Sequence, residues 1–172
     1  MKKPIAAAVL FLWIPMLESA QGGEHPYRGQ GYIFLGVGSG TDSPSFEHVG
    51  GGGEVLLFRG IGVGGELGAM GRPGEGEGVL SVGPSYHFLH AFRKSKIDPF
   101  VQGGYTGTFE GDAPIPGGSG NLFNFGGGMN YWFFKRVGLR LDFRDYVHHK
   151  SFFPAGGSTD QYWGVRVGLT VR

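Results

Sequence analysis

The sequence contains no cysteine, and its main part contains no long hydrophobic run. Without cysteine there is no disulfide framework, thiolate zinc site, iron–sulfur cluster or cysteine nucleophile. After residue 27 no apolar stretch approaches the roughly 18 residues that a membrane-spanning helix needs. The formal net charge is only +1, and no run of Lys and Arg forms a basic stripe, which argues against nucleic acid as a partner.

Glycine, in contrast, is abundant. It accounts for 36 of the 172 residues, about three times its usual share of roughly 7%. These glycines follow no three-residue period, and apolar residues still make up 40% of the chain. Neither a collagen nor a disordered chain fits this composition. The composition predicts one folded, glycine-rich β domain.

The first residues have the form of an export signal. Lys2 and Lys3 are followed by an apolar run from Ile5 to Leu17, which has the length of a signal peptide. We expect residues 1–22 to be a cleaved signal peptide and residues 23–172 to form the mature domain.

Along the mature chain, apolar and polar residues alternate. The pattern is clearest from Val137 to Val147, where odd positions are apolar and even positions are mostly Gly, Arg or Asp. Period-two alternation is typical of a strand whose two faces meet different surroundings. Similar segments make eight predicted strands, at 29–38, 48–58, 61–70, 78–88, 97–109, 121–134, 137–147 and 162–171. Leu56, Phe58 and Phe100 break the pattern, because they fall on the face that is otherwise polar.

The connections between these segments alternate in length. Tight turns are predicted at Arg59-Gly60 and Lys135-Arg136, whereas the links 39–47, 71–77, 110–120 and 148–160 are longer and rich in Gly, Pro, Ser and Asp. Basic residues collect at the short turns and acidic residues at the long links. The two ends of the predicted structure therefore differ in both loop length and charge.

A soluble barrel of the lipocalin or avidin kind would place its apolar face inward. Eight strands, however, enclose an interior just wide enough to be filled by side chains, and a face of Gly, Ser, Asn and a few charges suits that space. We therefore predict an all-β fold, an eight-stranded antiparallel up-and-down transmembrane β-barrel with its apolar face toward lipid. Interfacial aromatic girdles are expected among Tyr32, Tyr86, Tyr105, Tyr131, Trp132, Phe133, Tyr162 and Trp163.

The inward face collects charges of both signs. The predicted ionic network of the lumen consists of Glu54, Glu66, Arg140, Asp142, Arg144 and Arg166. Charges in a narrow lumen need partners. These residues could form a gated pore or a proton path, but a static salt-bridged core that plugs the barrel is the favoured interpretation.

Two histidines near the last long link are candidates for metal binding or catalysis. His148 and His149 could bind a metal, but neighbouring strand residues point apart and no other ligand cluster is visible. His149-Lys150-Ser151 has the H-x-S spacing of the outer-membrane lipid A deacylases, which this stretch resembles. In that family an Asn follows the Ser on a strand, whereas Phe152 and Phe153 follow here. We expect no catalytic residue, no metal site and no cofactor.

The run from Phe125 to Trp132, followed by Val137 to Tyr146, resembles the penultimate hairpin of the OmpA-like transmembrane domains. The resemblance covers about residues 27–172 and implies a small barrel in the bacterial outer membrane. It implies contact with membrane lipid and lipopolysaccharide, insertion by the barrel-assembly machinery and a monomeric state. The final segment, Gly168 to Arg172, ends without the aromatic residue typical of this family.

From these observations we expect a non-enzymatic integral outer-membrane protein with a structural or surface-interaction role and a plugged polar lumen. The alternatives are a lipid-modifying enzyme like the lipid A deacylases and a small pore.

Overall fold

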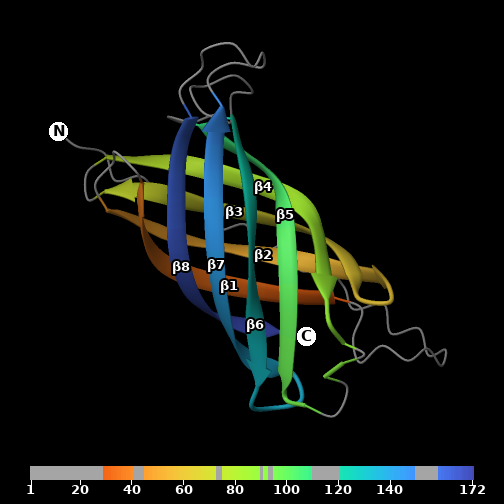
Figure 1. Ribbon diagram of the computed structural model, residues 1–172. Helices are drawn as coiled ribbons and strands as arrows, with labels where there is room; N and C mark the ends of the chain where they lie inside the picture. The colour runs from red at the N-terminus through yellow and green to blue at the C-terminus, as the bar shows by residue number, and fades with distance from the viewer. Residues whose placement is uncertain are drawn as a thin grey trace.

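A computed structural model describes residues 29–40, 45–72, 75–89, 91–92, 95–109, 121–149 and 159–172. The described chain forms eight antiparallel strands that close into a barrel, each strand pairing with its neighbours in the sequence and β8 with β1 (Figure 1). The strands are β1 (Gly29–Gly40), β2 (Phe46–Phe58), β3 (Ile61–Arg72), β4 (Glu75–His87), β5 (Ile97–Phe109), β6 (Asn121–Trp132), β7 (Val137–His149) and β8 (Thr159–Val171). The predicted fold class is confirmed. The predicted signal peptide lies outside the described residues.

Closure depends on the pairing of the first and last strands. Their register runs from Gly31 opposite Val171 to Gly40 opposite Tyr162, nearly the whole length of β1. In the described part of the barrel no strand is therefore left with an unpaired edge, as a β structure in hydrocarbon requires. Strands of 12 or 13 residues are about 43 Å long and, tilted by roughly 40°, rise about 33 Å. This exceeds the apolar band of about 25 Å in such barrels.

Most strands are longer than predicted. The pairing of β3 with β4, for example, continues to Arg72 opposite Glu75, beyond the predicted ends at 70 and 78. The extra residues lie mainly at the end with the long links. Backbone hydrogen bonds do not require apolar side chains, so the ladder continues past the alternating segment into polar surroundings. At the short-turn end β6 stops at Trp132, two residues earlier than predicted.

The two predicted tight turns differ in form. Arg59 and Gly60 have φ angles of 47° and 89°, the left-handed pair that a two-residue hairpin turn of type I′ requires. A Cβ atom at Gly60 would also collide with the carbonyl oxygen of His87. The second turn spans residues 133–136, and the Phe134 N–H donates to the Val137 carbonyl oxygen at 3.1 Å.

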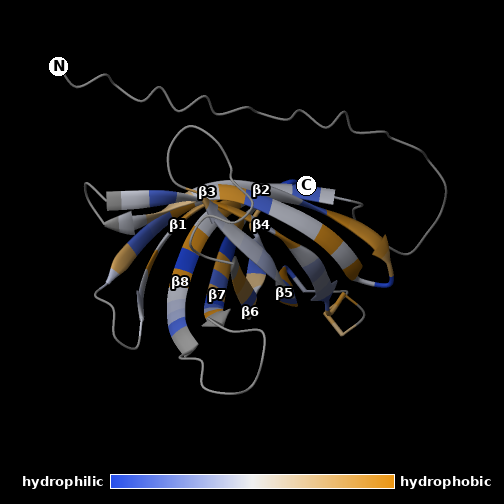
Figure 2. Cartoon of the chain, turned by 90° about the horizontal axis from the view of Figure 1, so that it is seen from above, coloured by the Kyte–Doolittle hydropathy of each residue, from blue (hydrophilic) through white to orange (hydrophobic). Residues whose placement is uncertain are grey.

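Most large apolar side chains point outward. Along single strands the hydropathy alternates between hydrophobic and hydrophilic residues (Figure 2). Ile33, Leu35, Leu67, Phe125 and Leu169 are each more than half exposed on the outer surface. The inward positions are buried and largely polar. Within the described residues no helix is long and apolar enough to cross a membrane.

The three residues that break the alternation have separate explanations. The β2–β3 register shifts between Leu56 and Phe58, and this irregularity turns Phe58 outward, where it is 60% exposed. Leu56 and Phe100 are buried inside the barrel. The sequence pattern treated all three alike, because it contains no sign of the bulge.

The expected aromatic girdles are only partly correct. Tyr86, Tyr105, Tyr131, Phe133 and Trp163 are exposed on the outer surface. Tyr32 and Trp132 are instead buried, because they share strand parity with the inward-facing residues. Both belong to the filling of the lumen.

Candidate functional site

The lumen is the place where polar side chains from all eight strands meet. We divide its polar residues into two groups by height. The upper cluster lies toward the long-link end and consists of Glu66, Ser81, Gln102, Thr106, Asn124, Asp142, Arg144 and Arg166. The lower cluster lies toward the short-turn end and consists of Gln30, Glu54, Ser85, His87, Asp98, Asn130 and Thr170.

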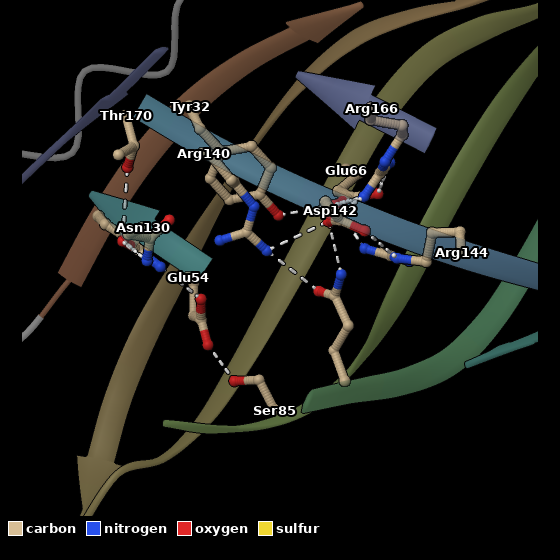
Figure 3. Close-up of polar contacts among 12 residues, drawn as sticks. Tyr32, Glu54, Glu66, Ser85, Asn130, Arg140, Asp142, Arg144, Arg166 and Thr170 are labelled. Atoms are coloured by element: carbon tan, nitrogen blue, oxygen red, sulfur yellow. Dashed lines mark hydrogen bonds and ion pairs between the residues drawn. The ribbon is translucent and has the colours of Figure 1, made fainter. Parts of the chain in front are cut away.

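Four charged residues form the centre of the upper cluster (Figure 3). Arg166 bonds Glu66 through Nη1 to Oε2 at 2.9 Å and through Nη2 to Oε1 at 3.2 Å. The same Nη2 reaches Asp142 Oδ2 at 2.6 Å. Arg144 Nη2 donates to Glu66 Oε1 at 2.7 Å. Within this group of four, each carboxylate therefore has two guanidinium neighbours, since Arg144 Nε also lies 3.5 Å from Asp142 Oδ1.

Neutral side chains extend the upper cluster toward the barrel wall. Gln102 Nε2 donates to Asp142 Oδ2 at 2.7 Å, and Arg144 Nη1 donates to Asn124 Oδ1 at 2.7 Å. Asn124 Nδ2 in turn donates to Thr106 Oγ1 at 2.8 Å. These bonds fix the orientation of the charged groups.

The lower cluster is built around His87, which is fully buried. Its Nδ1 lies 2.9 Å from Asp98 Oδ2, and its Nε2 lies 3.0 Å from Glu54 Oε1. When both carboxyl groups are ionised they can only accept, so both ring nitrogens donate and the imidazole carries a positive charge. Glu54 also accepts hydrogen bonds from Ser85 Oγ and, at 2.8 Å, from Gln30 Nε2.

Arg140 lies between the two clusters. Its guanidinium carbon is 4.2 Å from the ring centroid of Tyr32 and 3.9 Å from that of Phe100. Arg140 Nη2 donates to Gln102 Oε1 at 3.3 Å and lies 3.5 Å from Asp142 Oδ2. Among the described residues its Nε and Nη1 have no hydrogen-bond partner. The aromatic faces thus supply much of the stabilisation of this buried cation.

The charges of the lumen balance. In the upper cluster Arg144 and Arg166 offset Glu66 and Asp142. In the lower cluster one imidazolium faces two carboxylates, which leaves one negative charge, and Arg140 supplies the missing positive one. Four cations therefore meet four carboxylates: Arg140, Arg144, Arg166 and His87 against Glu54, Glu66, Asp98 and Asp142.

Aromatic and aliphatic side chains close the lumen above and below these clusters. Toward the long-link end, the ring of Phe34 packs edge-on against His48 at 4.9 Å, and His48 packs against Tyr146 at 6.2 Å. Toward the short-turn end, Leu56 and Trp132 pack together with Leu89. A cavity of about 20 Å³ beside Glu54 and Glu66 is room for about one water molecule.

Glycines on the inner face provide the space that the large side chains occupy. A Cβ atom at Gly52 would lie 2.8 Å from Cγ of Glu66 and 3.1 Å from a ring carbon of Tyr32. A Cβ atom at Gly126 would collide with the carbonyl oxygen of Phe143 on the next strand. The glycines of the inner face thus leave the room that the arginines and aromatic rings need inside the lumen.

The structure brings together five of the six residues predicted for the ionic network: Glu66, Asp142 and the three arginines. Glu54 is the exception, because its charged partner is His87 rather than an arginine. Asp98 and the aromatic partners of Arg140 are not among the residues predicted for the network. Asp98 could have been found from parity, since it shares the inward face of β5 with Gln102.

The histidines and the serine considered for metal binding or catalysis lie largely outside the described residues. His148 and His149 end β7, but their side chains, like Ser151 as a whole, lie outside what the structure describes. Among the described residues no group of three or more His, Cys, Asp or Glu side chains is arranged to hold a metal ion.

No protein-family model matches the sequence, and no curated protein matches it. Solved structures are similar in fold. Neisserial surface protein A has 12% identity and a TM-score of 0.57, with 86% of this chain and 97% of that chain covered. The N-terminal β-barrel domain of Pseudomonas aeruginosa OprF has 15% identity and a TM-score of 0.56, covering 82% and 96%. The outer-membrane enzyme PagL has 15% identity and a TM-score of 0.54, covering 80% and 97%.

These likenesses show the fold, which is that of the small eight-stranded outer-membrane β-barrels. The fold implied by the resemblance to OmpA-like transmembrane domains is confirmed. The expected localisation in the bacterial outer membrane agrees with these neighbours and with the apolar outer surface.

Proposed function

We propose that this outer-membrane barrel is a non-conducting, non-enzymatic protein with a structural or surface-interaction role. The observation that carries the proposal is the filled lumen, in which charges of opposite sign are paired. Leu56 and Trp132 close one end, and Phe34, His48 and Tyr146 close the other. A barrel of this kind offers its outer wall and its loops, rather than its interior, to other molecules.

The pairing in the lumen favours a static core over a gate. Glu66 is held by two arginines and by the hydroxyl of Tyr32, which donates to Oε1 at 2.8 Å. Removing one charged partner from a buried ion pair costs about 3–5 kcal/mol. A pathway for ions would require several such contacts to break together.

The fold alone does not decide the role. One similar structure is described as a surface protein and another as an enzyme, and a single scaffold commonly hosts several functions. The proposal for this chain therefore depends on its own lumen. Contact with lipopolysaccharide, insertion by the barrel-assembly machinery and a monomeric state belong to the same proposal.

Conductance in planar lipid bilayers tests the non-conducting state. The folded wild-type protein is expected to insert without producing current steps. A variant with three large lumen side chains removed, Tyr32→Ala/Phe100→Ala/Arg140→Ala, is expected to conduct if it folds, and it then shows that insertion occurred. Regular single-channel steps from the wild-type protein would overturn the proposal.

Analysis of lipid A tests the non-enzymatic state. Lipid A from cells that express the wild-type protein is expected to carry the same acyl chains as lipid A from cells that express His149→Ala/Ser151→Ala. Loss of an acyl chain in the wild-type sample alone would instead favour the deacylase alternative.

A further inference from the structure

We infer that the short-turn end of the barrel carries a binding site for the headgroup of an anionic phospholipid. The site is a group of cations around the end of β6: Lys96, Lys135, Arg136 and Arg172. The inference rests on the barrel spanning a membrane and goes beyond the proposed structural role, because it names a ligand class and the residues that select it.

Backbone contacts bring these four residues together. The N–H of Trp132 donates to the Lys96 carbonyl oxygen at 2.8 Å, which joins the start of β5 to the end of β6. The N–H of Arg172 donates to the Arg136 carbonyl oxygen at 3.0 Å, and Arg172 Nε donates to the Lys135 carbonyl oxygen at 2.8 Å. Residues from three distant parts of the sequence therefore form one basic surface.

The position of Arg172 is fixed by a further contact. Its guanidinium carbon lies 4.1 Å from the ring centroid of Trp132, so the side chain folds over the closed lower end of the lumen. Lys96, Lys135 and Arg136 are exposed. Among the described residues the acidic side chains at this end are Glu54 and Asp98, and both are buried inside the lower cluster. The exposed side chains of this surface therefore carry charge of one sign.

Exposed aromatic side chains adjoin the cations. Tyr131, Phe133 and Phe134 belong to the same end of β6 and its turn, and Phe134 is 71% exposed. Aromatic rings at this height are typical of the boundary between hydrocarbon and headgroups. The cations follow directly on these rings, so their charged groups reach the level of lipid phosphates.

The geometry selects the ligand class. In barrels of this type the short turns face the periplasm, so the basic surface meets the periplasmic leaflet. An anionic phospholipid supplies both an acyl chain for the aromatic wall and a net negative charge for the cations. A zwitterionic lipid supplies the same acyl chain without the net charge. Each lysine or arginine near an anionic surface raises the binding affinity roughly fivefold.

Native mass spectrometry of the folded protein in detergent tests the site. Phosphatidylglycerol and phosphatidylethanolamine with identical acyl chains are titrated in competition. The wild-type protein is expected to prefer phosphatidylglycerol by at least about fivefold, the contribution of a single cation, and added salt is expected to reduce that preference. Equal binding of the two lipids would overturn the inference.

Two triple variants locate the site. Lys96→Gln/Lys135→Gln/Arg136→Gln is expected to abolish the preference, whereas the charge-conserving Lys96→Arg/Lys135→Arg/Arg136→Lys is expected to keep it. Arg59→Gln, which removes a cation at another turn of the same end, is also expected to keep it. An unchanged preference in the glutamine variant would place the lipid elsewhere and contradict the inference.

Folding of each variant is checked by migration on a gel before and after heating, since a closed barrel resists detergent until boiled. If the glutamine variant does not fold, the single variant Arg136→Gln and the salt titration of the wild-type protein decide the matter. Failure of the lipid preference with an intact barrel leaves the proposed structural role untouched, because that role is tested by conductance.

Discussion

The guanidinium of Arg140 lies 3.9 Å from the ring centroid of Phe100. The same ring stacks against His87, with centroids 5.3 Å apart and planes inclined by 27°. Phe100 therefore contacts both the central cation of the lower cluster, His87, and the cation that lies between the clusters, Arg140. Phe100, which breaks the apolar–polar alternation of β5, thus stabilises two buried cations through the face of its ring.

Shortening this ring tests that role. Phe100→Leu keeps the inward side chain apolar but removes the π face, and it leaves a gap beside Arg140. We expect the free energy of unfolding to fall by about 1–3 kcal/mol, measured by urea denaturation in lipid vesicles. Phe125→Leu, at an outward position on β6, is the matched control and is expected to cost less. Equal losses would contradict the supporting role of Phe100.

The ion pair of Arg166 with Glu66 can be measured by a double-mutant cycle. Arg166→Met leaves Glu66 and Asp142 with one fewer cation, and we expect a loss of about 3–5 kcal/mol in unfolding free energy. Glu66→Gln alone leaves two arginines short of an anion. The double variant is expected to lose clearly less than the sum of the single losses. Additive losses would show that the two residues are not coupled.

Two neighbouring glycines provide a test of lumen packing. A Cβ atom at Gly52 would lie 2.6 Å from the Gly65 carbonyl oxygen, whereas at Gly53 its nearest neighbour is the Gln30 carbonyl oxygen at 3.5 Å. We expect Gly52→Ala to lower stability by about 1–3 kcal/mol through overpacking and Gly53→Ala to have little effect. The temperature at which the folded band disappears on a gel measures both. A larger effect at Gly53 would contradict the inward assignment of Gly52.

The cost of a charge on the lipid-facing surface is expected to depend on its depth in the membrane. Leu141 lies near the middle of β7 and points outward, so Leu141→Arg places a charge in the hydrocarbon. We expect a loss of about 2–4 kcal/mol in folding free energy in vesicles, and about 0–1 kcal/mol for Phe134→Arg at the end of the barrel. Similar losses at the two positions would contradict the assignment of the apolar band.

Strand parity, together with the strand count and the alternating link lengths, was enough to predict the fold and most of the lumen. The alternation from Val137 to Val147 fixes which side chains of β7 share a face, and the even count of strands lets β8 pair antiparallel with β1. Parity also placed Arg140, Asp142 and Arg144 inward. It does not fix which strands face each other across the lumen, because that depends on the stagger of the closed sheet.

The sequence pattern therefore could not predict which charged side chains pair across the lumen. Glu66 on β3 and Arg166 on β8 meet across the lumen, although 100 residues separate them along the chain. Glu54 could equally have met an arginine, and only the register of β2 brings it to His87. The outward orientation of Phe58 depends on a register shift that no residue type in the strand indicates.

The most direct test of the account asks which face of the barrel meets hydrocarbon. The chain has no native cysteine, so Leu141→Cys, Val167→Cys and Glu77→Cys each carry one thiol that a membrane-impermeant maleimide can label in intact outer membranes. If the apolar face meets hydrocarbon, labelling is strong at position 77, which is exposed at the long-link end, and almost absent at positions 141 and 167. Equal labelling at all three positions would show that the apolar face meets water, and it would contradict the account.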